Sequence, residues 1–155
     1  MTTDWSLPWN GGCRCGQLRI RATATPVLTM ACHCRGCQRM SASAYSLTAM
    51  FPSNCFVVTE GEPLIGGLHG EHRHFFCPHC KSWVFTRPRG VDQFVNVRPT
   101  MFDDVSWFRP FIETYTSEKL YWANTPAHHS FEKFPAMTDY ARLVAEYAQH
   151  VSMPT

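Results

Sequence analysis

Short segments in which hydrophobic and polar residues alternate run through most of the chain. Between residues 17 and 24, for example, Leu18, Ile20 and Ala22 alternate with polar or charged side chains. A period of two puts these three on one face, so the segment is expected to be a half-buried strand. Similar patterns predict strands at residues 27–31, 43–51, 56–59, 64–68, 72–77, 83–86, 94–98 and 111–116. Short strands at this spacing predict a mainly antiparallel β protein, with a hairpin turning at His69 and Gly70.

The end of the chain has a different period. From residue 139 to about 150, apolar residues recur at intervals of three and four, among them Leu143 and Tyr147. This spacing indicates one face of an α-helix. Thr138 can cap the N-terminus of that helix, and Asp139 suits its first turn. We expect one amphipathic helix that packs on the sheet.

Composition and charge narrow the class of protein. With 155 residues, 45% of them hydrophobic, the chain is expected to form one domain over residues 1–155, with a core at about 11–135. The formal net charge is only +2 without a basic block, so no nucleic-acid partner is expected. No apolar run is long enough to span a bilayer, so no membrane partner is expected. Residues 1–10 lack the apolar core of a secretory signal, which favours a cytoplasmic protein.

Eight cysteines stand out in such a chain. Cytosolic thiols stay reduced, so a disulfide framework is not expected. The spacing is more informative, because seven of the eight fall into a CxC, a CxCx2C and a CxxC motif: Cys13 and Cys15; Cys32, Cys34 and Cys37; Cys77 and Cys80. Such tight spacings strain a disulfide within a pair but suit tetrahedral thiolate coordination. Metal binding is therefore the preferred interpretation, and Cys55 is expected to be a small buried thiol.

The first and last motifs together supply four thiolates. On an extended segment, Cys13 and Cys15 would point to the same side, and Cys77 and Cys80 would converge across a tight turn. Four thiolates make a closed, structural zinc site. Because such a site joins distant parts of the chain, its binding energy becomes folding energy.

The middle motif supplies three thiolates, from Cys32, Cys34 and Cys37. Three protein ligands with an open fourth position are typical of a reactive zinc site. Thiolate-rich zinc activates water poorly and prefers another sulfur ligand, which indicates a thiol substrate. Arg35 and Arg39 could bind a substrate carboxylate or be ordinary surface residues. The alternative is a site closed by a fourth ligand, for which the candidates are Cys55, His33, His72, His74 and His79. His33 should point away from the ligands beside it, and the other histidines are expected to line a solvated hairpin.

Three motifs, in this order and spacing, resemble those of the glutathione-dependent formaldehyde-activating enzyme family. Residues 11–16 (GGCRCG) resemble its GGCxCG opening, residues 32–37 (CHCRGC) its CHCxxC, and residues 76–80 (FCPHC) its FCPxC. Looser similarities occur at residues 100–104 (TMFDD) and 119–122. The resemblance covers about residues 11–135.

The resemblance implies an Mss4-like β-tent fold of two small antiparallel sheets. It implies two zinc ions per chain: a structural one held by Cys13, Cys15, Cys77 and Cys80, and a catalytic one held by Cys32, Cys34 and Cys37. It also implies glutathione as the thiol partner and a carbon–sulfur lyase reaction that joins it to formaldehyde, giving S-(hydroxymethyl)glutathione. The alternative is a non-catalytic zinc module that binds a thiol or a protein partner.

Three residues depart from the family pattern, two beside the motifs and one in the late strand. Lys81 and Ala42 stand where members usually have glycine, and Glu113 stands where many have histidine. Because glycine often serves a positive φ, either the turn at Lys81 differs or that residue is strained. His128, His129 and His150 are expected to be surface residues rather than ligands. The sequence does not determine the oligomeric state.

Overall fold

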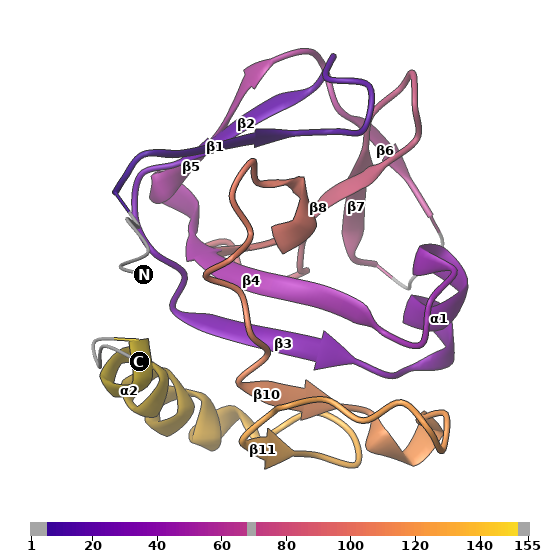
Figure 1. Ribbon diagram of the computed structural model, residues 1–155, viewed down its shortest axis with the longest axis vertical. Helices are drawn as coiled ribbons and strands as arrows, with labels where there is room; N and C mark the ends of the chain where they lie inside the picture. Colours follow the sequence, from indigo (N-terminus) through magenta and orange to yellow (C-terminus); the bar gives the residue numbers. More distant parts are fainter. Residues whose placement is uncertain (1–5, 68–70, 152–155) are drawn as a thin grey trace. The chain divides into compact units, whose positions relative to one another are not determined.

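A computed structural model of the chain describes residues 6–67 and 71–151 (Figure 1). These residues form two compact units. The first takes its residues from Met1–Pro26 and Ala49–Phe108, and the second from Val27–Thr48 and Arg109–Thr155. The expectation of one domain over the whole chain stays a prediction. Of the helices in the described part, none combines the length and apolar character needed to cross a bilayer.

The first unit contains antiparallel strands from both sheets of the fold. One sheet has the order β1 (Trp9–Gly12), β2 (Arg19–Ala22), β5 (Phe56–Glu60). The other contributes, in order, β4 (Ser46–Pro52, which begins in the second unit), β9 (Phe94–Val97), β8 (Trp83–Arg87), β7 (Arg73–Phe76) and β6 (Leu64–Gly66). Short 3₁₀ turns lie at Ser53–Cys55 and Pro99–Met101.

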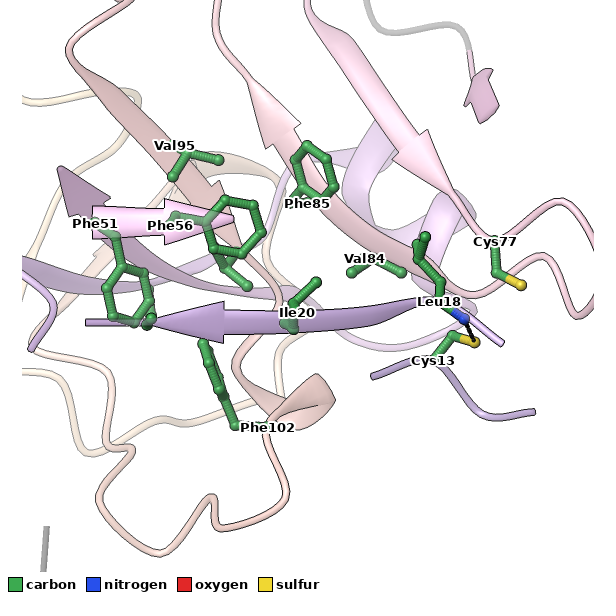
Figure 2. Close-up of a cluster of buried hydrophobic side chains, with 13 residues drawn as sticks. Cys13, Leu18, Ile20, Phe51, Phe56, Cys77, Val84, Phe85, Val95 and Phe102 are labelled. Atoms are coloured by element: carbon green, nitrogen blue, oxygen red, sulfur yellow. Dashed lines mark hydrogen bonds between the residues drawn. The ribbon is translucent and has the colours of Figure 1, made fainter. Parts of the chain in front are cut away.

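Alternating residues of these strands build the core of the first unit. Ile20, Phe51 and Val95 are fully or almost fully buried, and Phe85 stacks on Phe75 with ring centroids 4.6 Å apart. Figure 2 shows the same cluster reaching Cys13 and Cys77, whose sulfurs lie at one end of it. A structural metal at that end would therefore adjoin the main apolar core.

The second unit combines three strands with two helices. Its strands have the order β11 (His129–Ser130), β10 (Ile112–Thr114), β3 (Leu28–Cys32). β10 pairs in parallel with both neighbours, which the antiparallel expectation did not include. Parallel pairing needs a long connection, and β3 and β10 are far apart in the sequence. The helices are α1 (Arg35–Ser41) and α2 (Tyr140–Val151), and 3₁₀ turns lie at Thr116–Glu118 and Met137–Asp139.

The C-terminal helix forms for the reason its sequence indicates. Leu143 and Tyr147 are buried, and α2 packs against β3. Its start differs from the expectation, because Thr138 lies within the preceding 3₁₀ turn and α2 begins at Tyr140. The apolar spacing thus identified the helix, while Thr138 is part of the 3₁₀ turn rather than the cap.

The fold class is as predicted: mainly β, two sheets and a C-terminal helix, consistent with an Mss4-like β-rich fold. Each predicted strand has a counterpart, usually one to several residues shorter. β6 and β7 pair as predicted, but the turn at His69 and Gly70 lies outside the described residues. The sequence missed α1, because seven residues are too few to show a helical period.

Candidate metal centres

The four-cysteine group (Cys13, Cys15, Cys77 and Cys80) assembles within the first unit. All four sulfurs lie within 4.8 Å of one another. The sulfurs of Cys13 and Cys15 are 3.5 Å apart, and those of Cys15 and Cys77 are 3.7 Å apart. Cys13 and Cys77 are buried while Cys15 is exposed, so the group lies at the edge of the core. All eight cysteines of the chain are free of disulfides.

Two turns bring these sulfurs together. Cys13 and Cys15 lie in the turn between β1 and β2, closed by the Gly16 N–H donating to the Cys13 carbonyl at 3.0 Å. The expected extended segment is therefore wrong: the turn makes the two side chains converge. Cys77 and Cys80 lie in the turn between β7 and β8, closed by the Lys81 N–H donating to the Cys77 carbonyl at 2.9 Å.

The surroundings of this group shift the pKa values of its thiols in opposite directions. The Leu18 N–H donates to Cys13 Sγ at 3.3 Å, as Figure 2 shows. Desolvation raises the pKa of Cys80, but hydrogen bonds from Ser82 and backbone groups outweigh it and lower that pKa to about 5. A backbone hydrogen bond from Gln17 lowers the pKa of Cys15, but partial desolvation of its sulfur and its hydrogen bonds to the other thiols raise it to about 11. Four neighbouring thiols ionise together only beside a cation, so the donor set fits a metal ion.

The three-cysteine group (Cys32, Cys34 and Cys37) forms within the second unit, at the junction of β3 and α1. Its three sulfurs also lie within 4.8 Å of one another. Cys32 is the last residue of β3, Cys34 is the N-cap of α1, and Cys37 lies in the first turn. The Cys37 N–H donates to Cys34 Sγ at 3.3 Å. The three sulfurs therefore come together because β3 ends and α1 begins within the motif.

Neighbouring thiols dominate the electrostatics of this group. Hydrogen bonding with Cys32 and Cys34, and then burial, raise the pKa of the Cys37 thiol far above its usual value. The pKa of Cys32 is raised as well, first by its hydrogen bond with Cys34. Without a cation Cys32 and Cys37 therefore keep their protons, whereas a bound dication would displace them. This donor set also fits a soft metal ion.

His33 is turned away from its neighbouring cysteines, as expected. It is fully buried, and its Nε2–H donates to Glu113 Oε1 at 2.9 Å. The Thr125 hydroxyl donates to the other oxygen of Glu113 at 2.9 Å. Glu113, which stands where many family members have histidine, is therefore the partner that holds the imidazole between two candidate ligands.

The candidate fourth ligands do not join either cysteine group in the part of the chain that the structure describes. Cys55 is only half-buried, and its thiol donates to Asn54 Oδ1 at 3.4 Å. His72 accepts a hydrogen bond from the Arg89 N–H at 3.1 Å. His74 is not on a solvated surface as expected: it is 2% exposed, and its Nδ1 lies 2.8 Å from the Thr86 hydroxyl.

Both positions where the family usually has glycine adopt a left-handed backbone. Lys81 has φ +62°, and Ala42, the C-cap of α1, has φ +50° and ψ +42°. The turns are therefore kept and the residues are strained, because a Cβ disfavours this conformation. At Lys81, the side-chain ammonium donates to the Pro78 carbonyl, which offsets part of that strain.

Supporting residues around the three-cysteine group escaped the sequence analysis. The buried Gln38 side chain donates to the His33 carbonyl at 2.7 Å and to the Glu118 carbonyl at 3.1 Å. Glu118 Oε1 accepts the Arg35 N–H at 3.0 Å, at the start of α1. The guanidinium of Arg35 donates to Gln38, while Arg39 is exposed. A polar residue directly after Cys37 was the one available signal, and one of its partners, Glu118, lies eighty residues away.

These features define a mainly β protein with two groups of thiols placed to hold metal ions. A sequence model described as glutathione-dependent formaldehyde-activating enzyme matches residues 8–118, so the chain belongs to that family. The name of the family suggests glutathione-dependent activation of formaldehyde. No curated protein matches the chain.

One solved structure supports the fold assignment. A crystal structure of a Rhodobacter sphaeroides protein, determined as a structural genomics target, matches with a TM-score of 0.51 and 16% sequence identity. The match covers 79% of this chain and 98% of that chain. At this identity the likeness shows the fold alone.

Proposed function

We propose that this protein is a zinc-dependent carbon–sulfur lyase that joins glutathione, or a related thiol, to formaldehyde and catalyses the reverse cleavage. The observation that carries the proposal is the three-cysteine group. Within the described residues, no fourth cysteine, histidine or carboxylate joins its three sulfurs, which leaves one position of a tetrahedral ion for a substrate. The four-cysteine group, by contrast, supplies a complete set of ligands for a structural zinc.

The reaction needs a thiolate and a carbonyl carbon in contact. Zinc, when bound by Cys32, Cys34 and Cys37, would supply the positive charge that keeps a substrate thiol ionised at neutral pH. The substrate sulfur then forms a bond to the formaldehyde carbon, the carbon–oxygen π bond breaks, and the oxygen takes up the proton that the thiol released. The reverse reaction breaks the carbon–sulfur bond and returns the thiol and the aldehyde.

Residues of the chain hold this site in shape. The Glu113–His33 pair and the Gln38 side chain fix the backbone between Cys32 and Cys37. Fixed ligands keep the open position in one geometry, which lowers the entropic barrier for two reactants. Arg39, exposed on α1, supplies a cation for a carboxylate of the thiol substrate. A reducing compartment such as the cytoplasm, which keeps thiols free, suits this chemistry.

The test is a rate measurement. ¹³C-labelled formaldehyde and glutathione are mixed with the protein, and exchange between free aldehyde and adduct is followed by NMR. We expect faster exchange with the parent protein and no acceleration with Cys34→Ser. Cys55→Ser is the matched control, because Cys55 lies in neither group, and it should retain the acceleration.

Other outcomes separate the alternatives. Zinc at the three-cysteine group with thiol binding but no faster exchange would overturn the lyase and favour a thiol-binding zinc module. Equal affinity for glutathione in the parent and Cys34→Ser would remove the three-cysteine group from the function altogether. Calorimetric titration with glutathione, accompanied by metal analysis, distinguishes the two results.

A further inference from the structure

Three histidines that the sequence predicts as surface residues come together in the second unit. His128 precedes β11, His129 begins it, and His150 lies in the last turn of α2. The rings of His128 and His150 lie edge to face, with centroids only 4.1 Å apart. Strand and helix thus present imidazoles to the same place.

Phe111 forms the floor beneath these rings. Its ring centroid lies 5.2 Å from that of His128, 5.4 Å from that of His129 and 5.5 Å from that of His150. Together with Glu146 and Gln149, the four rings line a pocket of about 310 Å³. Phe111 is buried, whereas His128 and His150 are exposed. The pocket therefore has an apolar floor and imidazole walls that solvent reaches.

One of the imidazoles is already oriented by a carboxylate. His129 Nε2 lies 2.7 Å from Glu146 Oε2, and an ionised carboxylate can only accept, so Nε2 carries the proton. The hydrogen bond from His129 and the charge of Arg142, which lies 3.2 Å away, keep the pKa of Glu146 below its usual value. The Nδ1 lone pair of a neutral His129 is then available. This carboxylate–histidine pair is the arrangement that supports metal-ligating histidines.

We infer that this pocket is a binding site for a divalent transition-metal ion, with His128 and His150 as the first ligands and His129 as a third that Glu146 orients. Imidazole nitrogens suit zinc, copper and nickel, whereas magnesium and calcium prefer oxygen. Among the described residues, only the cysteine groups already have three or more ligand atoms within 4.8 Å of one another. Binding therefore requires the exposed rings to rotate, and the affinity is lower than at a thiolate site. The inference goes beyond the proposed function and does not depend on it.

The experiment uses full-length protein whose cysteine groups have been saturated with zinc and freed of excess metal. Zinc chloride is then titrated by calorimetry, while the histidine ring resonances are followed by NMR. We expect one further ion per chain that shifts the resonances of His128 and His150. His128→Ala and His150→Ala should each weaken this binding at least about tenfold. Gln149→Ala, on the same pocket wall, is the matched control and should bind like the parent.

Two results would overturn the inference. One is no further ion up to about 1 mM zinc, the weak end of specific binding. The other is equal binding by the parent and the His128→Ala, His150→Ala double variant, which would show that the ion binds elsewhere. Both side chains are exposed, so far-UV circular dichroism should show an unchanged fold and loss of binding can be assigned to the lost ligands.

Discussion

Both groups consist of cysteines, but they differ in how far apart their cysteines lie along the chain. The four-cysteine group joins the turn at Cys13 to the turn at Cys77, far apart in the sequence and both at the edge of the main core. The three-cysteine group lies within six residues, at one strand–helix junction. A link that closes a long loop removes more freedom from the unfolded chain than a local one. The first group is therefore suited to holding the fold, and the second can bind and release a ligand without unfolding the protein.

The largest expected effect follows from breaking the long-range group. Cys77 is fully buried, and Cys77→Ser removes one of the four proposed zinc ligands. Structural zinc contributes about 10–16 kcal/mol to folding, as much as the whole stability of a typical domain. We expect Cys77→Ser to lose cooperative thermal unfolding and the dispersed NMR spectrum of the first unit.

Cys55→Ser is the control for that experiment, because it changes the same atom in a cysteine outside both groups. It should unfold cooperatively with a melting temperature close to that of the parent. A folded Cys77→Ser protein that still holds its full complement of zinc would show that the four-cysteine group is not the structural link.

Breaking the local group should have a different outcome. Cys34 is the N-cap of α1, where its sulfur accepts the Cys37 N–H. Serine is a good N-cap, so Cys34→Ser keeps the helix start while removing a proposed thiolate ligand. We expect bound zinc to fall from two ions per chain to one, with cooperative unfolding retained. Metal analysis measures the bound zinc, and calorimetry measures the cooperativity of unfolding. If Cys34→Ser lost its fold to the same extent as Cys77→Ser, the two cysteine groups would not differ in their role.

The hydrogen-bonded pair of His33 and Glu113, which positions the backbone of the three-cysteine group, can be tested separately. Glu113 is 6% exposed and accepts hydrogen bonds from His33 and Thr125. Glu113→Ala leaves a buried imidazole N–H without its acceptor, which costs about 1–3 kcal/mol. Glu113→Gln keeps an acceptor and should cost less. Chemical denaturation measures both, and equal stability of the parent and Glu113→Ala would mean that the pair does not hold this site.

The sequence predicted which cysteines lie together better than it predicted the geometry that gathers them. Spacing alone grouped the seven cysteines as the structure does, because thiolate motifs are local and chemically distinctive. It assigned Cys13 and Cys15 to an extended segment, although a turn brings them together. It also missed α1, which is too short for a period, and the partners of His33, since Glu113 becomes its neighbour only when β10 pairs with β3. Long-range pairing leaves no local trace in the sequence.

The smallest effects on stability are expected from substitutions in the two strained turns, one beside each cysteine group. Ala42 and Lys81 both have positive φ, which costs an L-residue about 1–2 kcal/mol, while glycine loses about 0.5–1 kcal/mol through its freer unfolded state. Ala42→Gly should therefore stabilise the protein by about 0.5–1 kcal/mol, or about 2 °C in melting temperature. Lys81→Gly should gain less, because it also loses the hydrogen bond from the lysine ammonium to the Pro78 carbonyl.

Lys81→Asn separates the two contributions at that turn. Asparagine tolerates the left-handed region better than lysine but cannot reproduce the contact with Pro78. If strain dominates, Lys81→Asn should be at least as stable as the parent; if the ammonium contact dominates, it should be less stable. Differential scanning calorimetry on the zinc-loaded proteins resolves shifts of this size. A larger gain in stability for Lys81→Gly than for Ala42→Gly would contradict the expectation. It would mean that the turn at Lys81, beside the four-cysteine group, is more strained than the turn at Ala42.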